Sequence, residues 1–488
     1  MKKYHVDVLV CGGGVAGVAA AVHAARGGAR TMIIEGQGTF GGLVTNDYIT
    51  GIAGYMCGFV QEYVDRLYEK GWACHYIHDC VDPEKGKFML EQMVLESGAQ
   101  IMYHTEIVDA ITEDNKIVSA VCHGKGGLFE VEADLFIDAT GDGDLAAYAG
   151  CIYDSGSSKY GGYNAPTSLG FRLSNVNLKK YNEASRAWMK TDAAKGKYSY
   201  SSDLFAEAIK NGDMPDYVFP GFLAYKVPGT DDECADVTID LCHARQCRNL
   251  DPEDVTRQTI LMHRQILMLE EVFHKYFPGY ENCFLEGIGC IPGFRETRRI
   301  IGEYVLTDMD VLVGSKFDDG ITIVTDTLCQ HHPTSARAGF LAHKHVPEPI
   351  DGLICRPTQD NDWDMHPYME ETGYEARNNQ QSYCEIPYRC IVPKKIDNIL
   401  TAGRCISTEW HAQIAPRLIS PSFQLGQAAG VAAAMCIKQG KTPRELDGKE
   451  VRKALVEGGK YGIPLDPRFE RPVPKELVYH GDQLRARF

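Results

Sequence analysis

Short apolar runs separated by glycines open the chain and predict a strand–helix–strand unit. Residues 6–10 (VDVLV) are mostly apolar and have the length of a buried strand, and the small-residue stretch 15–27 has the length of a helix. A second apolar run at 29–34 follows as the next strand. Because a helix joins the two apolar strands, the pattern predicts a βαβ unit and a parallel sheet.

Two later patterns predict antiparallel strands and a long helix. Residues 103–110 and 116–122 alternate apolar and polar side chains, and the turn residues 113–115 (EDN) join them as in a hairpin. Residues 252–276 follow a helical pattern, with Asp251 as the N-cap and a proline at the first helical position.

A small-residue helix is expected near the end of the chain. Residues 398–402 form a short apolar strand, and an Ala/Gly-rich helix is predicted from 422 to 439. Pro421 precedes this helix and Ser422 has the side chain of an N-cap. Its glycines and alanines would allow close packing on a sheet.

These elements predict an α/β protein with a split nucleotide-binding domain of the Rossmann type. Residues 1–150 form its first part and residues 390–445 the returning part. Residues 151–389 are expected to form an inserted α+β substrate-binding region, with polar loops at 154–163 and 359–381. Residues 446–488 are a C-terminal tail whose role the pattern does not indicate.

Composition narrows the functional classes. The 488 residues carry 50 Lys and Arg against 66 Asp and Glu, a net charge of -16, which disfavours nucleic acid and anionic membranes as partners. The longest apolar run, 15–25, is interrupted by Gly17 and His23, and the start leaves no room for a signal peptide. We therefore expect a soluble, cytoplasmic protein that acts on a small molecule.

The cysteines fit a reducing compartment better than a disulfide framework. There are 17 of them, an odd number, and they include no C-x-x-C pair. Cys74, His75, His78 and Cys80 lie close together, but without the paired spacing of a structural zinc site. We therefore predict no metal. Cys57 is either a reactive thiol that could attach a cofactor covalently or an inert buried one, and the second reading is preferred.

A glycine-rich turn after the first strand carries the first chemical signal. The turn consists of Gly12, Gly13, Gly14, Val15, Ala16 and Gly17. Gly12 permits a tight turn, Gly14 lets backbone amides approach a pyrophosphate, and Gly17 lets helix and strand pack closely. Glu35, at the end of the second strand, would accept hydrogen bonds from a ribose and repel a 2′-phosphate. The pattern predicts dinucleotide binding; the alternative is a Rossmann-like unit with an empty cleft.

Several further segments resemble one family. They are EGQ at 35–37 with FGGLVT at 40–45, ADLFIDATGDGD at 133–144, FRETRRIIGEY at 294–304 with FDDG at 317–320, IPYRC at 386–390, NILTAGR at 398–404 and PSFQLGQAAG at 421–430. Together they resemble the FAD-dependent oxidoreductase family, which shares its flavin fold with the fumarate reductase and glutathione reductase groups. The resemblance covers most of residues 5–440. It implies a glutathione reductase-like FAD-binding domain.

The resemblance also implies which residues hold FAD. Besides the glycine turn, they are Glu35, Gly36, Gln37, Gly41, Gly42, Leu43, Thr45, Ile107, Val108, Ala139, Thr140, Gly141, Asp144, Gly403, Arg404, Gly426, Gln427 and Ala428. Backbone near 107–108 would hold the adenine. The N-terminus of the helix at 422–439 would direct its partial positive charge at N1 and O2 of the flavin. The alternative for that helix is an ordinary core helix.

Five residues are candidates for the substrate chemistry: Thr45, His411, Arg417, Tyr388 and Arg389. Thr45 either lines the pocket or fixes the following turn. His411 could carry a proton or be a hydrogen-bonded core histidine. Arg417, where this family usually has an arginine, could clamp a carboxylate or carbonyl or form a structural ion pair. Tyr388 and Arg389 precede the last strand and could face the substrate.

Two other groups are harder to assign. The Arg295, Glu296, Arg298 and Arg299 cluster has alternating charges, and for most of it a structural role is favoured. His331 and His332 stand where the family is expected to have a D-x-H element; the stretch 325–332 reads TDTLCQHH instead. This departure indicates a divergent substrate.

The leading functional hypothesis is hydride transfer between FAD and a small polar organic substrate, by a dehydrogenase or a reductase of an activated double bond. An NADH-linked or disulfide-linked flavin reductase is a second reading, disfavoured because there is no C-x-x-C and no second glycine turn with a matching acid. A third is an FAD-binding electron-transfer subunit that works with a protein partner. The sequence does not decide whether the protein uses an external electron acceptor or donor, or whether it forms a homo-oligomer.

Overall fold

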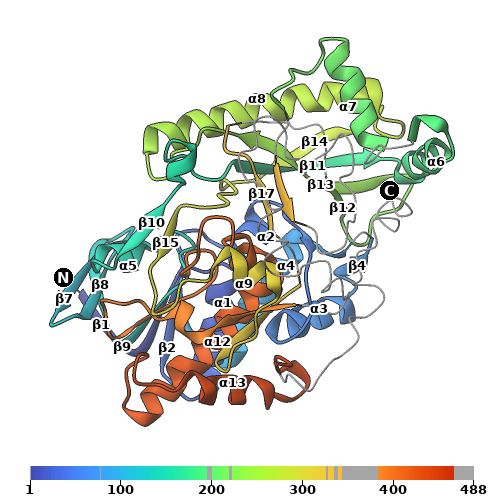
Figure 1. Cartoon of the computed structure of the whole chain (residues 1–488). Coiled ribbons are helices and arrows are strands. Elements are labelled where there is room, and N and C mark those ends of the chain that lie inside the picture. Colours follow the sequence, from blue (N-terminus) through green and yellow to red (C-terminus); the bar gives the residue numbers. More distant parts are fainter. Residues whose placement is uncertain are drawn as a thin grey trace.

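The computed structural model describes residues 2–76, 78–194, 200–218, 223–325, 328–334, 339–342 and 383–465 (Figure 1). The loop expected at 359–381 and the tail beyond 465 lie outside the described residues. The first part of the chain forms β1 (Lys2–Cys11), α1 (Val15–Arg26), β2 (Thr31–Ile34), α2 (Leu43–Asn46), β3 (Gly51–Ile52), α3 (Phe59–Glu69), β4 (Ala73–His75), β5 (Asp79–Val81), α4 (Pro83–Ser97), β6 (Gln100–Met102), β7 (Glu106–Glu113), β8 (Lys116–Gly124), β9 (Gly127–Asp138) and α5 (Asp144–Tyr148).

The middle and late parts add a second set of elements. The middle contains β10 (Tyr153–Ser155), β11 (Thr167–Val176), α6 (Leu178–Trp188), α7 (Tyr200–Lys210), β12 (Leu223–Lys226), β13 (Ala235–Ala244), α8 (Pro252–Tyr276), β14 (Phe284–Ile288), β15 (Arg298–Ile300), α9 (Asp308–Val313), β16 (Gly320–Val324), β17 (Leu328–His331), β18 (Gly339–Ala342) and β19 (Cys384–Pro387). The late part contains β20 (Ile399–Thr401), α11 (Ile414–Arg417), α12 (Ile419–Gln439) and α13 (Gly448–Val456).

The main sheet has the order β6-β2-β1-β9-β8-β7, with β20 beside β9. The pairs β1–β2, β1–β9, β2–β6 and β9–β20 are parallel, whereas β7–β8 and β8–β9 are antiparallel. The predicted βαβ unit and hairpin are therefore confirmed. Asp114 and Asn115 both have positive φ, as a two-residue hairpin turn requires. The α/β class is also confirmed, with a sheet that is mostly parallel around its centre.

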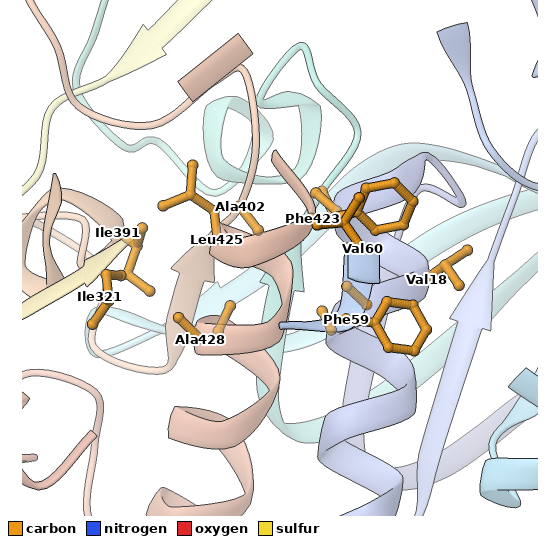
Figure 2. Packing of buried hydrophobic residues seen from close by; sticks show 14 of the residues in the cluster. Val18, Phe59, Val60, Ile321, Ile391, Ala402, Phe423, Leu425 and Ala428 are labelled. Carbon is orange, nitrogen blue, oxygen red and sulfur yellow. The ribbon is translucent and has the colours of Figure 1, made fainter. Parts of the chain in front are cut away.

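Helices α1 and α12 pack against each other on this sheet, and Figure 2 shows part of the core around them. A Cβ on Gly426 would lie 2.0 Å from the carbonyl oxygen of Ala16, and one on Gly430 would lie 2.3 Å from that of Ala20. The two helices therefore run in the same direction in backbone contact. Phe59 and Phe423 close the core beside them, with ring centroids 6.0 Å apart.

The start of α12 differs from the prediction. The helix begins at Ile419, three residues earlier than expected, and Ser422 is not its N-cap. The Ser422 hydroxyl donates to the carbonyl oxygen of Pro416 at 2.6 Å. Pro421 does not prevent the earlier start, because the N–H groups of a first helical turn have no partner within the helix.

A second, antiparallel sheet lies apart from the first, in the order β12-β13-β11-β14, and α8 covers it (Figure 1). The predicted helix α8 is confirmed at both ends. The Asp251 carboxylate caps it by accepting from the amide of Glu253 at 3.0 Å. Met262, Ile266 and Leu269 are among the side chains that bury one face of α8 in a separate core.

Strands from the expected insertion also contribute to the core of the main sheet. β16 and β19 pair with each other, and Ile321 and Ile386 share the hydrophobic core that contains Phe423 of α12. The range 151–389 is thus not one separate layer. Among the described residues, no helix combines the length and the apolar character needed to cross a bilayer.

Candidate functional site

The glycine turn has the geometry that the pattern predicts. Gly12 has φ +95°, and a Cβ there would lie 2.6 Å from the carbonyl oxygen of Ala139. A Cβ on Gly17 would lie 1.8 Å from the carbonyl oxygen of Gly12. Gly14, at the N-cap of α1, differs because a Cβ there would meet no atom within 4 Å. Two glycines therefore serve packing, and the third leaves space at the start of a helix, where a pyrophosphate would fit.

Glu35 ties the end of β2 to this turn. Its carboxylate accepts from the amide of Gly13 at 2.6 Å and from the amide of Gln37 at 2.7 Å. Burial raises the pKa of Glu35, and these two amides oppose that shift. The carboxylate is thus held beside the glycine turn, where it was expected to meet a ribose.

The second glycine pair packs on the first turn. The amide of Gly41 donates to the carbonyl oxygen of Gly13 at 2.9 Å, and a Cβ on Gly42 would lie 3.1 Å from Cα of Gly14. Leu43 then begins α2. The structure favours the turn-fixing alternative for Thr45, because its buried hydroxyl donates to the carbonyl oxygen of Phe40 at 2.7 Å. The prediction that Thr45 takes part in the substrate chemistry is therefore withdrawn.

The segment expected to bind adenine runs beside Glu35. The amide of Thr105 donates to the carbonyl oxygen of Glu35 at 3.0 Å, and the next residues begin β7. Gly36 lies against Glu106, whose Cγ would be 3.4 Å from an added Cβ. Ile107 and Val108 follow directly, so they lie near the Glu35–Gln37 turn.

The A-T-G turn and the late G-R pair meet on the other side of the glycine turn. Gly403 has φ +80°, and a Cβ there would lie 3.0 Å from Cβ of Ala16. Arg404 donates through Nε to the carbonyl oxygen of Gly141 at 2.9 Å and pairs with Asp142 at 2.6 Å. These contacts bring both segments to the start of α1.

Three side chains in these segments are bound to protein groups. Asp144 pairs with Arg298 at 2.7 Å, and the Arg404 guanidinium holds the turn that contains Gly141 and Asp142. The Thr140 hydroxyl donates to Asp138 at 2.8 Å. In the structure these side chains stabilise the turn, and the role of the turn in binding FAD stays a prediction.

The expectation for Gln427 and Ala428 needs correction. The Gln427 side chain accepts from the amide of Phe59 at 2.8 Å and donates to the carbonyl oxygen of Tyr461 at 3.0 Å. Ala428 is fully buried in the core (Figure 2). Because α12 begins three residues earlier than predicted, residues 426–428 lie about two turns inside the helix. Gly426 acts by packing on α1.

The start of α12 extends past the start of α1. Gly426 lies level with Ala16, so six more residues precede the contact in α12 than in α1. At a rise of about 1.5 Å per residue, the N-terminus of α12 projects roughly 9 Å beyond that of α1. A dinucleotide with its pyrophosphate at α1 would extend toward this second N-terminus.

Tyr388 and Arg389 lie at the wrong end of the molecule for the predicted role. The buried Tyr388 hydroxyl donates to the carbonyl oxygen of Pro443 at 2.9 Å, beyond the C-terminus of α12. Arg389 pairs with Asp319 at 2.9 Å beside a surface cavity of about 370 Å³. Since α12 is about 30 Å long, these two residues are remote from the glycine turn. They are removed as candidates for the substrate chemistry.

His411 belongs to a buried acid–imidazole pair. Its Nδ1 donates to Oδ2 of Asp308 at 2.9 Å, and the other Asp308 oxygen accepts from the amide of Ala412 at 2.7 Å. The pair fixes the orientation of the imidazole and directs Nε2 away from the acid. The sequence indicated His411 but not Asp308, because the two residues are 103 positions apart.

A cluster of cationic and imidazole side chains lies between the two sheets. We call it the cationic cluster, and it consists of Arg245, Arg295, Arg417, His243 and His331. Arg295 Nη2 donates to His243 Nε2 at 2.8 Å, and the rings of His243 and His331 are 5.0 Å apart. The pKa of His331 is lowered well below its usual range by burial and by Arg295, Arg417 and Arg245. The sequence indicated Arg417 and flagged His331, but it did not indicate that they meet.

Asp47 connects this cluster with the glycine segments. It follows α2 directly and is fully buried, and Oδ1 accepts from the amide of Gly170 in β11 at 2.7 Å. Burial raises its pKa well above the usual range, Asp240 adds to that shift, and Arg295 opposes it. Asp47 was missed because a lone aspartate after a short helix carries no sequence signal.

Most of the 295–299 cluster has the structural role that was favoured. The buried Glu296 carboxylate accepts from the amides of Gly156 at 2.7 Å and Ala165 at 3.0 Å, and it pairs with Arg299. Only Arg295 turns toward the cationic cluster.

The described cysteine and histidine side chains at 74–80 make contacts within the stretch and with β12. Cys74 Sγ donates to the carbonyl oxygen of Lys226 at 3.9 Å, and the rings of His78 and Tyr225 are 6.3 Å apart. His75 Nδ1 lies 3.5 Å from Asp79, and Cys80 is buried. Within the described ranges, no three or more His, Cys, Asp or Glu side chains converge in a way that could hold a metal ion. Cys57 is buried, which agrees with the inert alternative.

Comparisons with known proteins agree with this arrangement. A family model described as FAD dependent oxidoreductase matches residues 7–455. The chain is also similar to the thiamine thiazole synthases of Pyrococcus horikoshii and Pyrococcus abyssi, with 26% and 27% identity over 166 residues. These matches cover 30% of this chain and 62% of each relative, so the chain spans less than two thirds of their length.

The matches among solved structures are more distant in sequence. A geranylgeranyl bacteriochlorophyll reductase-like protein from Thermoplasma acidophilum is 12% identical, with a TM-score of 0.45, over 99% of this chain and 90% of that one. A p-nitrophenol 4-monooxygenase from Pseudomonas putida is 10% identical, with a TM-score of 0.44, over 100% and 96%.

Proposed function

The chain belongs to the family of FAD dependent oxidoreductases, and we propose that it transfers a hydride between its FAD and a small polar organic substrate. FAD, when bound, supplies the acceptor or donor of the hydride. The residues of the chain would bind the substrate, hold it beside the cofactor, exclude water and carry the accompanying proton. A dehydrogenase and a reductase of an activated double bond fit this description equally.

The observation that carries the proposal is the convergence of both cofactor-binding segments on one polar site. The segment after Gly41 and Gly42 leads to Asp47, which lies near Arg295. Arg417 lies two residues before the start of α12. Two segments far apart in sequence therefore lead from the expected cofactor site to the same group of charged side chains.

The residues at the cofactor site fit FAD. Gly14 leaves open space at the N-terminus of α1, and Glu35 holds a carboxylate beside it. The α12 N-terminus extends farther in the same direction, so a dinucleotide would meet two helix N-termini along its length. We further propose the glutathione reductase-like arrangement, because the antiparallel strands β7 and β8 follow the βαβ unit and β20 returns beside β9.

His411 is proposed as the group that carries the proton. Asp308 holds the Nδ1 proton, so Nε2 is the atom that would accept or donate one. The imidazole lies in the segment between β20 and α11, close to Arg417 in sequence. Its own N-terminal neighbour, Trp410, packs edge-on against the ring at 4.8 Å. This packing limits rotation of the imidazole.

Flavin retention tests the cofactor half of the proposal. Gly14→Val should yield folded protein without FAD, because an added Cβ meets no protein atom within 4 Å and the side chain would occupy the space expected for the pyrophosphate. Gly126→Val is the matched control, since a Cβ there also meets nothing within 4 Å, and it should retain FAD. Flavin absorbance released on denaturation measures both. Retention of FAD by Gly14→Val would place the cofactor elsewhere.

Anaerobic spectroscopy tests the chemical half. The oxidised protein is mixed with hydroxy acids, alcohols, amines and sugars, and the dithionite-reduced protein with unsaturated acids and ketones. We expect one class to bleach or restore the flavin spectrum, and His411→Gln to slow that step at least about tenfold with FAD retained. An unchanged rate in His411→Gln would remove its role. Electron exchange with proteins alone would overturn hydride transfer to a small molecule.

A further inference from the structure

The cationic cluster gathers side chains from four separate parts of the chain. His243 is the last residue but one of β13 and Arg245 follows the strand directly, whereas His331 ends β17. Arg295 lies between β14 and β15, and Arg417 ends α11. Only the tertiary structure brings these residues together, at the junction of the two sheets.

Direct contacts hold the centre of the cluster. Arg295 is 8% exposed, and its Nη1 donates to the carbonyl oxygen of Pro166 at 3.1 Å while Nη2 donates to His243. The gap between β13 and β17 is bridged by the amide of Gln246, which donates to the carbonyl oxygen of Pro333 at 2.8 Å. The guanidinium of Arg295 is therefore fixed in place.

The surroundings of these groups disfavour additional positive charge. Burial and the neighbouring Arg295 lower the pKa of Arg245 to about 10. The pKa of His243 is lowered well below its usual range by burial, Arg295 and His331. Of the acids that face Arg295, Asp240 lies 3.9 Å from it, and Asp47 has a strongly raised pKa. An anion entering this region would thus be attracted by several guanidinium groups at low dielectric.

The cluster is also linked to the proposed proton carrier. The ring of Tyr160 lies 5.0 Å from His332, next to His331, and 5.4 Å from Trp410, next to His411. The rings of His332, Tyr160, Trp410 and His411 therefore form a row, and His331, the sequence neighbour of His332, belongs to the cationic cluster.

The segment that carries the second glycine pair is attached to the same region. Asp47 accepts from the amide of Gly170, and the hydroxyls of Thr50 and Thr238 are 2.7 Å apart. These contacts join the segment after α2 to β11, which begins beside the cluster, and to β13, which ends there. The position of the cluster relative to the cofactor segments is thus set by buried polar contacts.

We infer that the cationic cluster binds a carboxylate group of the substrate, so that the enzyme acts on small organic acids rather than on neutral alcohols, sugars or amines. Guanidinium groups match a carboxylate in both charge and planar geometry, which favours a two-pronged contact. Arg245 and Arg417 would hold the carboxylate, and Arg295 would position His243 beside it. This inference rests on the proposed function, because it treats the cluster as the substrate side of the flavin.

Anion binding to the FAD-loaded protein tests the inference without turnover. Short mono- and dicarboxylates, their amides and inorganic phosphate are titrated by calorimetry in chloride-free buffer, with the flavin absorbance recorded in parallel. We expect at least one carboxylate to bind at least about tenfold more tightly than its amide and to perturb the flavin spectrum. Equal affinity of acid and amide, or binding of phosphate alone, would overturn the inference.

Matched variants assign the binding to these side chains. Arg245→Gln and Arg417→Gln should each weaken carboxylate binding about tenfold or more with the FAD content unchanged. Arg264→Gln, at an exposed position of α8, is the control and should bind normally. Arg245→Lys retains the charge and should lose less than Arg245→Gln. If both glutamine variants bind as the control does, the cluster is not the carboxylate site.

The two proposals fail in distinguishable ways. Loss of FAD in Gly14→Val, together with turnover of a neutral substrate by the unchanged protein, would support the oxidoreductase function. The same result would overturn the assignment of the cluster to a carboxylate. Carboxylate binding that persists while no small molecule exchanges electrons with the flavin would overturn the proposed function.

Discussion

Two contacts in the molecule use opposite kinds of residue. One is the contact between α1 and α12, and the other is the contact between the Asp47 segment and the second sheet. In the first, glycine and alanine bring backbones together, as at Gly426 and Ala16, and nothing polar is needed. In the second, Asp47 and Thr50 reach into β11 and β13 through buried hydrogen bonds. Both contacts lie close to the expected cofactor site.

The difference shows how one fold can be rigid in one place and selective in another. Backbone contact depends only on the absence of side chains, so it holds two helices at a set distance whatever the ligand. A buried carboxylate or hydroxyl is stable only with its specific partners, so it defines one arrangement of the two sheets. The cofactor would rest on the first contact, and the substrate would meet the second.

The largest expected effect comes from enlarging the small-residue contact. In Gly426→Val the added carbon would start 2.0 Å from the carbonyl oxygen of Ala16, so the helices must separate. We expect insoluble protein or a loss of about 5 kcal/mol in the free energy of unfolding, measured by urea denaturation. Lys438→Val, on the exposed end of the same helix, is the control. If Gly426→Val were as stable as the control, α1 and α12 could separate at little cost and the predicted role of the contact would be wrong.

Removing a buried charge should have the next largest effect. Glu296→Ala deletes the acceptor for the amides of Gly156 and Ala165 and leaves Arg299 buried without this partner. A loss of about 3 kcal/mol or more is expected, again by urea denaturation. Glu233→Ala breaks an exposed pair with Lys179 and should change the midpoint little. Similar midpoints for both variants would contradict the structural role of Glu296.

Acid should destabilise the protein through its buried neutral histidines. Burial lowers the pKa of His23 in α1 to about 4, against about 6.5 in the unfolded chain. Below pH 6.5 the unfolded chain therefore binds a proton at His23 that the folded protein does not bind. At pH 5 this difference lowers the free energy of unfolding by about 2 kcal/mol. His243 and His331 act in the same direction.

Denaturation at pH 7.5 and pH 5 measures this loss. The variant His23→Gln does not titrate, so its stability should fall less between the two pH values than that of the unchanged protein. An equal fall in both would show that His23 is not the group responsible.

The smallest effect is expected for Arg389→Ala. The side chain is about half exposed, and its pair with Asp319 lies near the C-terminal end of α12. Such a pair contributes about 0 to 1 kcal/mol, and neither the FAD content nor the reduction rate should change. A severalfold slower reduction would return this arginine to the substrate site and contradict its position in the fold.

Local signals in the sequence were sufficient for several elements. Asp251 with the following proline determined the start of α8, and two turn residues determined the β7–β8 hairpin, because caps and tight turns depend on neighbours a few positions away. The start of α12 was misplaced because Pro421 is as acceptable in the third position of a helix as before it. The partners of Gln427 lie on α3 and at Tyr461, beyond the reach of any local rule.

By itself, the sequence determined the nucleotide-binding turn, because its glycines act within one strand–turn–helix unit. The resemblance of several longer segments to one family then indicated the family and FAD. The tertiary structure alone decided which candidates meet: Asp308 joins His411, three arginines converge with two histidines, and Tyr388 and Arg389 lie at the far end of α12. The reason is physical. The interactions that stabilise a turn come from adjacent residues. The interactions that stabilise a buried polar site come from partners that only the folded chain brings together.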